Sequence, residues 1–190
     1  MQTHIDRVLL DRKTIAHRVE ELADEIARDF AAPGSSDPQA GNTHMELVLV
    51  PLLTGSIIFL ADLVRKMPLM MRMRMLSISS YPGKSTASHG VTIHPPMPTD
   101  LAGKHVLIVD DILDSGRSVT AVRQLIAQQN PASVRVCVLL RKKIPSALAV
   151  PADYIGFDIP DEFVVGYGLD YDGYYRNLPE VCTLKAEAIH

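Results

Sequence analysis

The chain has 190 residues, of which 47% are hydrophobic and 22% are charged, and its net charge is −3. This size and composition are typical of a globular protein, so we expect a single domain over residues 1–190. The slight negative charge argues against bulk electrostatic binding to nucleic acid.

The hydrophobic pattern also argues against a membrane protein. The N-terminal segment has no apolar signal core. The longest apolar stretch, 57–63, is interrupted by Asp62 and is too short to cross a bilayer. We therefore expect a cytoplasmic protein with no membrane partner and no nucleic-acid partner.

The first part of the chain predicts a helix, a loop and a strand–helix unit. Apolar residues recur at helical spacing after a capping Asp11, namely Ile15, Val19, Leu22, Ala23, Ile26 and Phe30. Small residues and breakers over 31–44 predict a flexible loop. The apolar run 47–51 predicts a strand that ends at the polar turn 53–56, and a helix follows through Val64.

The middle of the chain predicts a strand and a long loop. Residues 69–79 alternate as M-R-M-R-M, which is typical of a half-buried strand, and we expect the methionines to pack in the core. The same strand is also a candidate for a subunit interface. Residues 80–98 are rich in proline, glycine and serine, and a loop of this length is often a mobile lid over an active site.

The remaining strands predict an α/β sheet. Buried strands are expected at 106–109 and 134–140, with a helix after the first of them, and short strands are expected at 154–157 and 163–165. Alternating strands and helices give a mostly parallel sheet, in which ligands bind at the carboxyl ends of the strands. The polar strand ends should therefore line one crevice, and they are residues 54–56, 110–111, 114–118 and Lys142.

The segment 110–118 has the residue types of a ribose phosphate site. Residues 114–118 form a small, hydroxyl-rich turn that enters a helix, where backbone N–H groups favour a bound anion. The segment lacks the P-loop signature of nucleoside triphosphate sites. Asp110 and Asp111 are acceptors suited to a diol or to hydrated Mg²⁺. The alternative interpretation is a capped helix beside a solvated acidic loop.

Several motifs resemble a known family. The segment VLIVDDILDSGRS at 106–118 is similar to the phosphoribosyl-pyrophosphate (PRPP) motif of type I phosphoribosyltransferases. The segment FVVGYGLDYDGYYR at 163–176 closely resembles the C-terminal part of hypoxanthine-guanine phosphoribosyltransferases. LLTGS at 52–56, SSY at 79–81 and the lysine after LLR at 142 match in the same order. The resemblance covers about residues 47–178.

This resemblance implies a fold and a reaction. The fold would be the type I phosphoribosyltransferase fold, a mostly parallel central sheet flanked by helices, with a small hood formed by the N- and C-terminal segments. The reaction would transfer the 5-phosphoribosyl group of PRPP to N9 of hypoxanthine or guanine, with Mg²⁺, and would release IMP or GMP and pyrophosphate. The family commonly forms homodimers or homotetramers, so we expect one of these.

The resemblance also implies a role for each matching residue. Asp114 would be catalytic and take the proton from purine N7. The residues that bind PRPP would be Asp110, Asp111, Asp114, Ser115, Gly116, Arg117 and Ser118. The residues that bind pyrophosphate would be Leu53, Thr54, Gly55 and Arg176, with a cis peptide between Leu53 and Thr54.

The purine, the metal and the lid have their own implied residues. The purine would be bound by Lys142, Phe163, Val164 and Asp170. The Mg²⁺ ions would be held by Asp110, Asp111 and Asp170. Ser80 and Tyr81 would be the contacts of the lid. The family usually has Glu-Asp where this chain has Asp110-Asp111, and the shorter side chain leaves room for a water at the ribose diol.

Other interpretations stay open at this point. By itself, Phe163 is a candidate core residue, Lys142 a solvated strand end and Arg176 a surface ion-pair partner. An enzyme of the same fold that uses uracil or xanthine is one alternative, and the purine-binding residues discriminate poorly between hypoxanthine, guanine and xanthine. A PRPP-sensing regulator and a partner with a vestigial site are the alternatives without activity.

Overall fold

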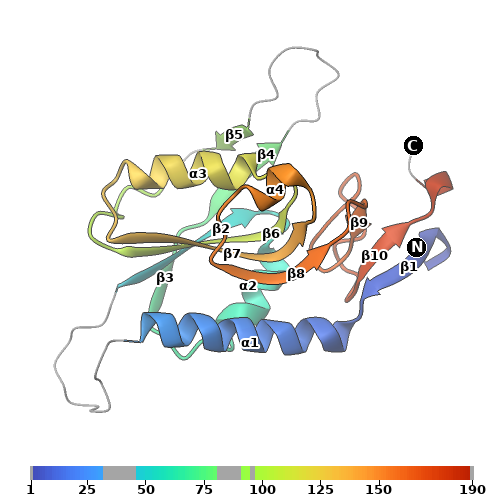
Figure 1. The fold of residues 1–190 in the computed structure, drawn as a ribbon, viewed down its shortest axis with the longest axis horizontal. Coiled ribbons are helices and arrows are strands. Elements are labelled where there is room, and N and C mark those ends of the chain that lie inside the picture. The colour runs from blue at the N-terminus through green and yellow to red at the C-terminus, as the bar shows by residue number, and fades with distance from the viewer. Residues whose placement is uncertain (1, 32–45, 81–90, 95–96, 189–190) are drawn as a thin grey trace.

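The structure of the chain is a computed structural model that describes residues 2–31, 46–80, 91–94 and 97–188 (Figure 1). The predicted loop 31–44, apart from Ala31, lies outside the described residues. So do residues 81–90 and 95–96 of the predicted lid, which therefore stays a prediction. No helix in these described ranges is long and apolar enough to cross a membrane.

A mostly parallel sheet forms the centre of the molecule, as predicted (Figure 1). Its strands are β2 Leu47–Leu53, β3 Met71–Met73, β4 Leu76–Ser80, β5 Val91–His94, β6 His105–Leu113, β7 Ser133–Lys142 and β8 Tyr154–Ile159. The spatial order is β5-β4-β2-β6-β7-β8, with β3 paired to β2. Only the β4–β5 pair is antiparallel. The carboxyl ends of β2, β6, β7 and β8 therefore lie along one edge.

Helices cover both faces of this sheet (Figure 1). The helices α1 Arg12–Phe30 and α2 Ile57–Val64 pack on one face, and α3 Arg117–Ala127 and α4 Pro145–Leu148 pack on the other. Strand side chains alternate between the faces, so Leu107 and Val109 join the α1 core while Val106 and Ile108 join the α3 core.

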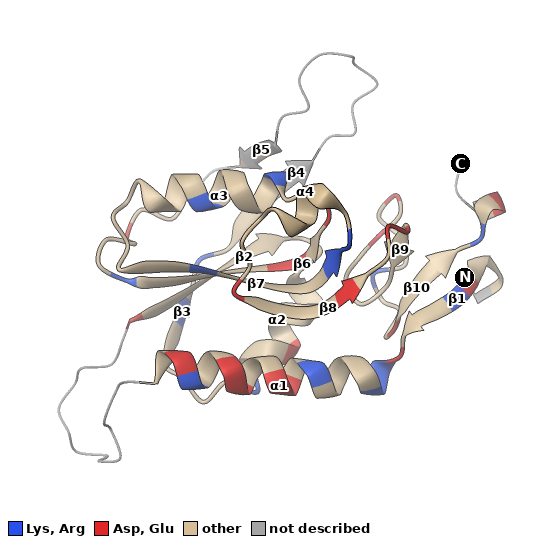
Figure 2. Cartoon of the chain, in the orientation of Figure 1, with Lys and Arg blue, Asp and Glu red and all other residues tan. Residues whose placement is uncertain are grey.

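The first helix agrees with its sequence pattern. Asp11 caps α1 by accepting hydrogen bonds from the N–H groups of Lys13 and Thr14, at 2.8 and 3.0 Å. All six of the apolar residues predicted to be its buried stripe are buried. Acidic and basic residues lie along the outward side of the helix (Figure 2). The predicted amphipathic helix and its cap are confirmed.

A second, small sheet joins the two ends of the chain. It consists of β1 Ile5–Leu10, β10 Val181–Leu184 and β9 Val164–Val165, all antiparallel, in the order β1-β10-β9. Short 3₁₀ helices lie beside it, η1 Gln2–His4 and η2 Ala186–Ala188. This sheet lies beyond the carboxyl end of β8 (Figure 1). The hood implied by the resemblance is confirmed, although the sequence pattern predicted neither β1 nor β10.

The predicted strand 69–79 is interrupted in the structure. It forms β3 and β4, which pair with β2 in a single register, Leu47 with Met71 and Leu52 with Leu76. The interruption lies opposite Val50 and Pro51. Because proline has no N–H to donate, the ladder breaks at this point and resumes one residue later.

The methionines of this segment are not in the core, so that prediction is wrong. The exposed fractions of Met70, Met73 and Met75 are 78%, 45% and 49%. Only Met71 packs against the α1 core, and it is partly buried. The reason is that β3 is a three-residue strand at the margin of the sheet and pairs with β2 alone. The side chains of Met70, Met73 and Met75 are therefore exposed to solvent at this margin of the sheet.

Strand β6 is longer than predicted. The acidic residues Asp110 and Asp111 lie inside the strand and not after it. The strand continues because its backbone pairs with β7 as far as Leu113 opposite Arg141. The carboxylates are therefore held by a rigid, paired strand rather than by a loop.

Candidate active site

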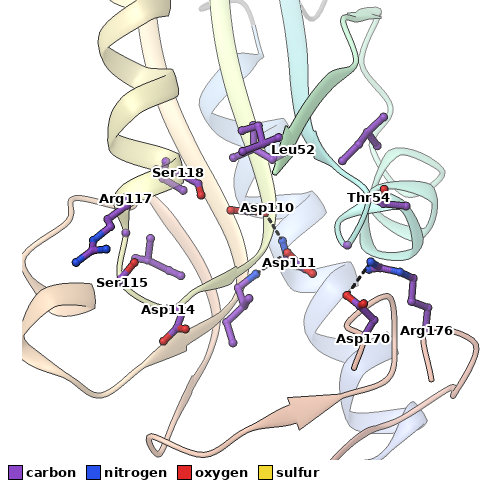
Figure 3. A pocket seen from close by; sticks show the side chains of 17 residues that line it. Leu52, Thr54, Asp110, Asp111, Asp114, Ser115, Arg117, Ser118, Asp170 and Arg176 are labelled. Carbon is purple, nitrogen blue, oxygen red and sulfur yellow. Dashed lines mark hydrogen bonds and ion pairs between the residues drawn. The ribbon is translucent and has the colours of Figure 1, made fainter. Parts of the chain in front are cut away.

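A cavity of about 490 Å³ opens at the carboxyl ends of β2 and β6 (Figure 3). Its walls come from the end of β2, the end of β6 with the turn into α3, and a loop near the C-terminus. The lining residues are 52–55, 78, 110–119, 170 and 176. The predicted crevice is present, and all the residues implied for PRPP and pyrophosphate line it. Ser56 and Lys142 were predicted to line it as well and do not.

The turn 114–118 forms one wall. Gly116 is the N-cap of α3 and has a left-handed backbone, with φ of 75°. A Cβ at this position would overlap the side chain of Val150, so glycine is required both by conformation and by space. Glycine has no side chain that could cap the first N–H groups of the helix. The N-terminus of α3 and the hydroxyls of Ser115 and Ser118 therefore line the cavity as anion donors.

Two carboxylates of β6 line the cavity, Asp110, which is buried, and Asp111, which is partly buried. Asp110 and Asp111 are successive strand residues, so their side chains point to opposite faces of β6 (Figure 3). Asp110 is only 7% exposed, and it accepts a hydrogen bond from the N–H of Asp111 at 3.0 Å. Asp111 accepts one from the N–H of Ile112 at 3.1 Å and lies so close to Gly55 that a Cβ there would overlap it.

Burial makes this pair of acids costly to ionise. Burial is the largest cause that raises the pKa of Asp110 well above its ordinary value, and the charge of Asp111 adds to it. Burial also raises the pKa of Asp111. Two carboxylates in such a place favour a cationic partner, because a cation removes both the desolvation cost and the mutual repulsion.

The residues fit a weakly held Mg²⁺ better than a caged metal. Within the described parts of the chain, no group of three or more His, Cys, Asp or Glu side chains is arranged around a metal position. Mg²⁺ usually binds through one or two carboxylates, several waters and the phosphates of a substrate. Asp110, Asp111 and Asp170 all line the cavity and supply that kind of donor set.

The C-terminal loop places a guanidinium opposite the carboxylates. Arg176 pairs with Asp170 Oδ1 at 2.7 Å and donates to the carbonyl of Gly168 at 2.6 Å (Figure 3). The other Asp170 oxygen accepts from the N–H of Gly173 at 2.7 Å. Gly168 has φ of 105°, and a Cβ there would overlap the carbonyl oxygen of Gly55. The loop is thus held against the end of β2.

The end of β2 has the backbone that the resemblance implies. The peptide between Leu53 and Thr54 is cis. The next turn is held by the Ser56 hydroxyl, which is buried and donates to the carbonyl of Leu52 at 2.6 Å. Residues 53–55 therefore line the cavity together with Arg176.

Lys142 belongs to a neighbouring cluster and does not line the cavity. Its Nζ lies 3.1 Å from Asp114 Oδ1 and 3.0 Å from Asp161 Oδ1. Burial lowers the pKa of the ammonium, but its bonds to Asp161 and Asp114 outweigh this, and the pKa is raised overall. The lysine is therefore charged at neutral pH, and its side chain is only 12% exposed. The interpretation as a solvated strand end is wrong.

Of the other residues implied for the purine, Asp170 lines the cavity, whereas Phe163 and Val164 do not. Phe163 is 47% exposed, so it is not a core residue, and its ring packs edge-to-face on Tyr171 with centroids 5.6 Å apart. Val164 is buried and pairs with Thr183 in the small sheet. Neither residue lines the cavity. Ser80 ends β4, and Tyr81 lies outside the described residues.

Some contributors were not predicted from the sequence. Leu52, Ile78 and Val119 supply apolar lining, and none of them had a predicted role in the site. Asp161 pairs with Lys142, but it lies in a turn with no motif of its own. The one signal for Asp161 was its place just after a strand, at the same edge of the sheet as the other polar strand ends.

Known proteins share this fold and these motifs. Residues 8–172 match the family described as phosphoribosyl transferase domain. The chain is 40% identical over 181 residues to the hypoxanthine-guanine phosphoribosyltransferase of Mycobacterium tuberculosis, covering 95% of this chain and 86% of the relative. It is 40% identical over 175 residues to the hypoxanthine phosphoribosyltransferase of Haemophilus influenzae, covering 92% of each.

A solved structure agrees over the whole chain. The hypoxanthine phosphoribosyltransferase of Staphylococcus aureus superposes with a TM-score of 0.87 at 32% identity, covering 100% of this chain and 97% of that one. The fold and the site together define a phosphoribosyltransferase domain. Within that class, the chain belongs to the hypoxanthine(-guanine) phosphoribosyltransferases, which are enzymes of purine salvage. The resemblance seen in the sequence motifs is confirmed.

Proposed function

We propose that the chain transfers the 5-phosphoribosyl group of PRPP to N9 of hypoxanthine or guanine, releasing pyrophosphate. The observation that supports it best is the single cavity, in which an anion cradle, buried carboxylates and a guanidinium face one another. These are the groups that a phosphate, a diol and a pyrophosphate require.

The PRPP molecule is placed along the cavity. Its 5-phosphate is bound by residues 115–118 at the N-terminus of α3. Its ribose hydroxyls are bound by Asp110 and Asp111, and its pyrophosphate by the backbone of 53–55 and the forked donors of Arg176. Asp110, Asp111 and Asp170 would hold Mg²⁺, which would supply positive charge to stabilise the pyrophosphate.

The purine is placed over the Lys142 cluster. Lys142 donates to the purine O6, Phe163 stacks on the ring, and Val164 and Asp170 bind its edge through the backbone. Phe163 is suited to stacking because nearly half of its side chain is exposed. This arrangement favours a 6-oxopurine, because an ammonium donates to a carbonyl oxygen and repels a 6-amino group.

The reaction then follows from the charges. The bond from ribose C1 to the pyrophosphate oxygen breaks, a bond from C1 to N9 forms, and Asp114 accepts the proton of N7. Positive charge develops on the ribose, while Arg176 stabilises the negative charge of the leaving group. Water must be kept away from C1, because it would trap the same cation.

The test is pyrophosphate release with PRPP and Mg²⁺, in separate reactions with hypoxanthine, guanine, xanthine, adenine and uracil. We expect turnover with hypoxanthine or guanine, no turnover with adenine or uracil, and loss of turnover when EDTA removes the metal. Reactions without a base are the control for simple hydrolysis of PRPP. Tight PRPP binding without turnover on any base would contradict the proposal and favour a PRPP sensor.

We also propose that the chain forms a homodimer or homotetramer through the exposed methionine edge, which comprises Met70, Met73 and Met75. Three exposed methionines lie close together in the sequence at the margin of the sheet, and their flexible side chains suit an adaptable interface. Light scattering after gel filtration should give two or four times the 20.9 kDa mass. Replacing Met70 and Met73 with glutamate should lower that mass. A monomeric wild-type protein would overturn this proposal.

A further inference from the structure

Three neighbouring strands end in one charged cluster at the margin of the cavity, of which Asp114 lines the cavity and Lys142 and Asp161 do not. Asp114 follows β6, Lys142 ends β7, and Asp161 follows β8. In Figure 2 the basic end of β7 lies beside the acidic end of β8. Lys142 is on the middle strand, so its ammonium is shared between the two flanking carboxylates, at 3.1 and 3.0 Å.

The two carboxylates have different tasks in the proposed reaction. Asp114 must leave Lys142, at least in part, to accept the proton of purine N7. An ammonium has three N–H donors, so a second carboxylate can hold it while a third donor reaches the purine oxygen. Asp161 is the second carboxylate, and neither the motifs nor the comparisons assign it a role.

Removing Asp161 would change which carboxylate pairs with the ammonium of Lys142. Lys142 is nearly buried, and its charge needs a partner. With Asp161 removed, Asp114 would be the carboxylate left in contact with the ammonium, and the pair would tighten. The ammonium of Lys142 would then move away from the purine oxygen, and the carboxylate of Asp114 would move away from purine N7.

We propose that Asp161 is a positioning residue that holds Lys142 toward the O6 of a 6-oxopurine and thereby releases Asp114 to accept the proton. The inference rests on the proposed function and deepens it. It assigns the preference for a 6-oxo over a 6-amino purine to three residues, Asp114, Lys142 and Asp161, rather than to the lysine alone.

The variant Asp161→Asn tests this, with Asp158→Asn as a matched control. Asp158 also lies at the end of β8, but it pairs with Arg141 at 2.6 and 3.0 Å instead of Lys142. Binding of IMP and of AMP is measured by calorimetry, together with kcat and KM for hypoxanthine and the melting temperature. Binding needs no turnover, so it reports on the cluster independently of activity.

We expect Asp161→Asn to weaken IMP binding roughly tenfold to a hundredfold, as for loss of a charge-assisted hydrogen bond, and to leave AMP binding unchanged. KM for hypoxanthine should rise and kcat should fall. The variant Asp161→Glu, which keeps the charge, should recover most of the affinity. Asp158→Asn should behave as wild type in every measurement.

A double-mutant cycle separates positioning from a structural role. If Asp161 acts through Lys142, then Asp161→Asn should add little to the loss of IMP binding already caused by Lys142→Met. The inference would be overturned if Asp161→Asn weakened IMP binding equally with Lys142 present and with Lys142→Met. It would also be overturned if Asp161→Asn weakened the binding of IMP and AMP equally. Either result would leave the proposed function intact. A wild-type protein that binds IMP no better than AMP would contradict both.

Discussion

Replacing Asp114 with asparagine is expected to lower kcat with hypoxanthine by about 10²–10⁴-fold, the usual range for loss of a general base. Asparagine keeps the size of the side chain and a hydrogen-bonding oxygen, but it cannot take up the N7 proton. Pyrophosphate release under saturating PRPP and hypoxanthine measures the effect.

Two properties should survive this substitution. The fold should be unchanged, because the side chain of Asp114 is 58% exposed and Lys142 keeps its second partner, Asp161. The affinity for PRPP should fall little, because the cradle donors of 115–118 remain. Melting temperature and calorimetric PRPP binding check these points. A kcat within tenfold of wild type would show that Asp114 is not the base.

Replacing Asp110 with asparagine is expected to have opposite effects on stability and on binding. In metal-free protein, the substitution removes a buried acid that lies beside the charge of Asp111. We expect a stability gain of about 0.5–2 kcal/mol, as is common when a functional site is relieved of a costly group. At this chain length, each kcal/mol raises the melting temperature by about 2–4 °C.

The stability gain should depend on pH in a defined direction. The pKa of Asp110 is raised above its ordinary value of 3.8 in the folded state, so the unfolded chain loses this proton at lower pH than the folded one. Below about pH 4 both states hold the proton, and wild type and variant should be equally stable. As the pH rises above that value, Asp110 ionises in the unfolded wild type and stabilises the unfolded state. The variant should therefore become more stable than wild type by an amount that increases with pH.

The affinity of Asp110→Asn for PRPP should fall, although its stability rises. Asparagine removes one negative charge and one acceptor for the ribose or for Mg²⁺, so PRPP affinity in the presence of Mg²⁺ should fall tenfold or more, about the loss of a charge-assisted hydrogen bond. Thermal unfolding with EDTA and calorimetry with Mg²⁺ and PRPP measure the two effects. A variant that is less stable at pH 7, or a gap that widens toward acid pH, would contradict this account.

Much of this architecture is local in origin and was predictable. The α1 stripe and its Asp11 cap, the buried runs of β2, β6 and β7, and the glycine turn at 116 each depend on neighbours within a few residues. The rule that parallel strands carry ligands at their carboxyl ends predicted that 54–56, 110–111, 114–118 and Lys142 share one crevice. All of these residues except Ser56 and Lys142 line the cavity. Family motifs added the roles, because they occur in the same order along the chain.

The predictions that were wrong share a different physical origin. They concern features that depend on which distant segments pair with each other in the sheet. Pro51 interrupts the predicted strand 69–79 only because the two segments pair, and the methionines are exposed only because β3 lies at the margin of the sheet. The end of β6 could not be found from its own residues, since pairing with β7 carries it through Asp110 and Asp111.

The sequence by itself determined the fold class, the glycine turn at 114–118 and the family, since these depend on local periodicity and on contiguous motifs. Only the tertiary structure decided that Asp114, Lys142 and Asp161 share one cluster and that Arg176 is held by Asp170 and Gly168. These contacts join residues from different strands and loops, and side chains reach across such distances only after the sheet has set its order. The sequence therefore specifies which charged side chains are present, and the whole fold specifies where they lie relative to one another.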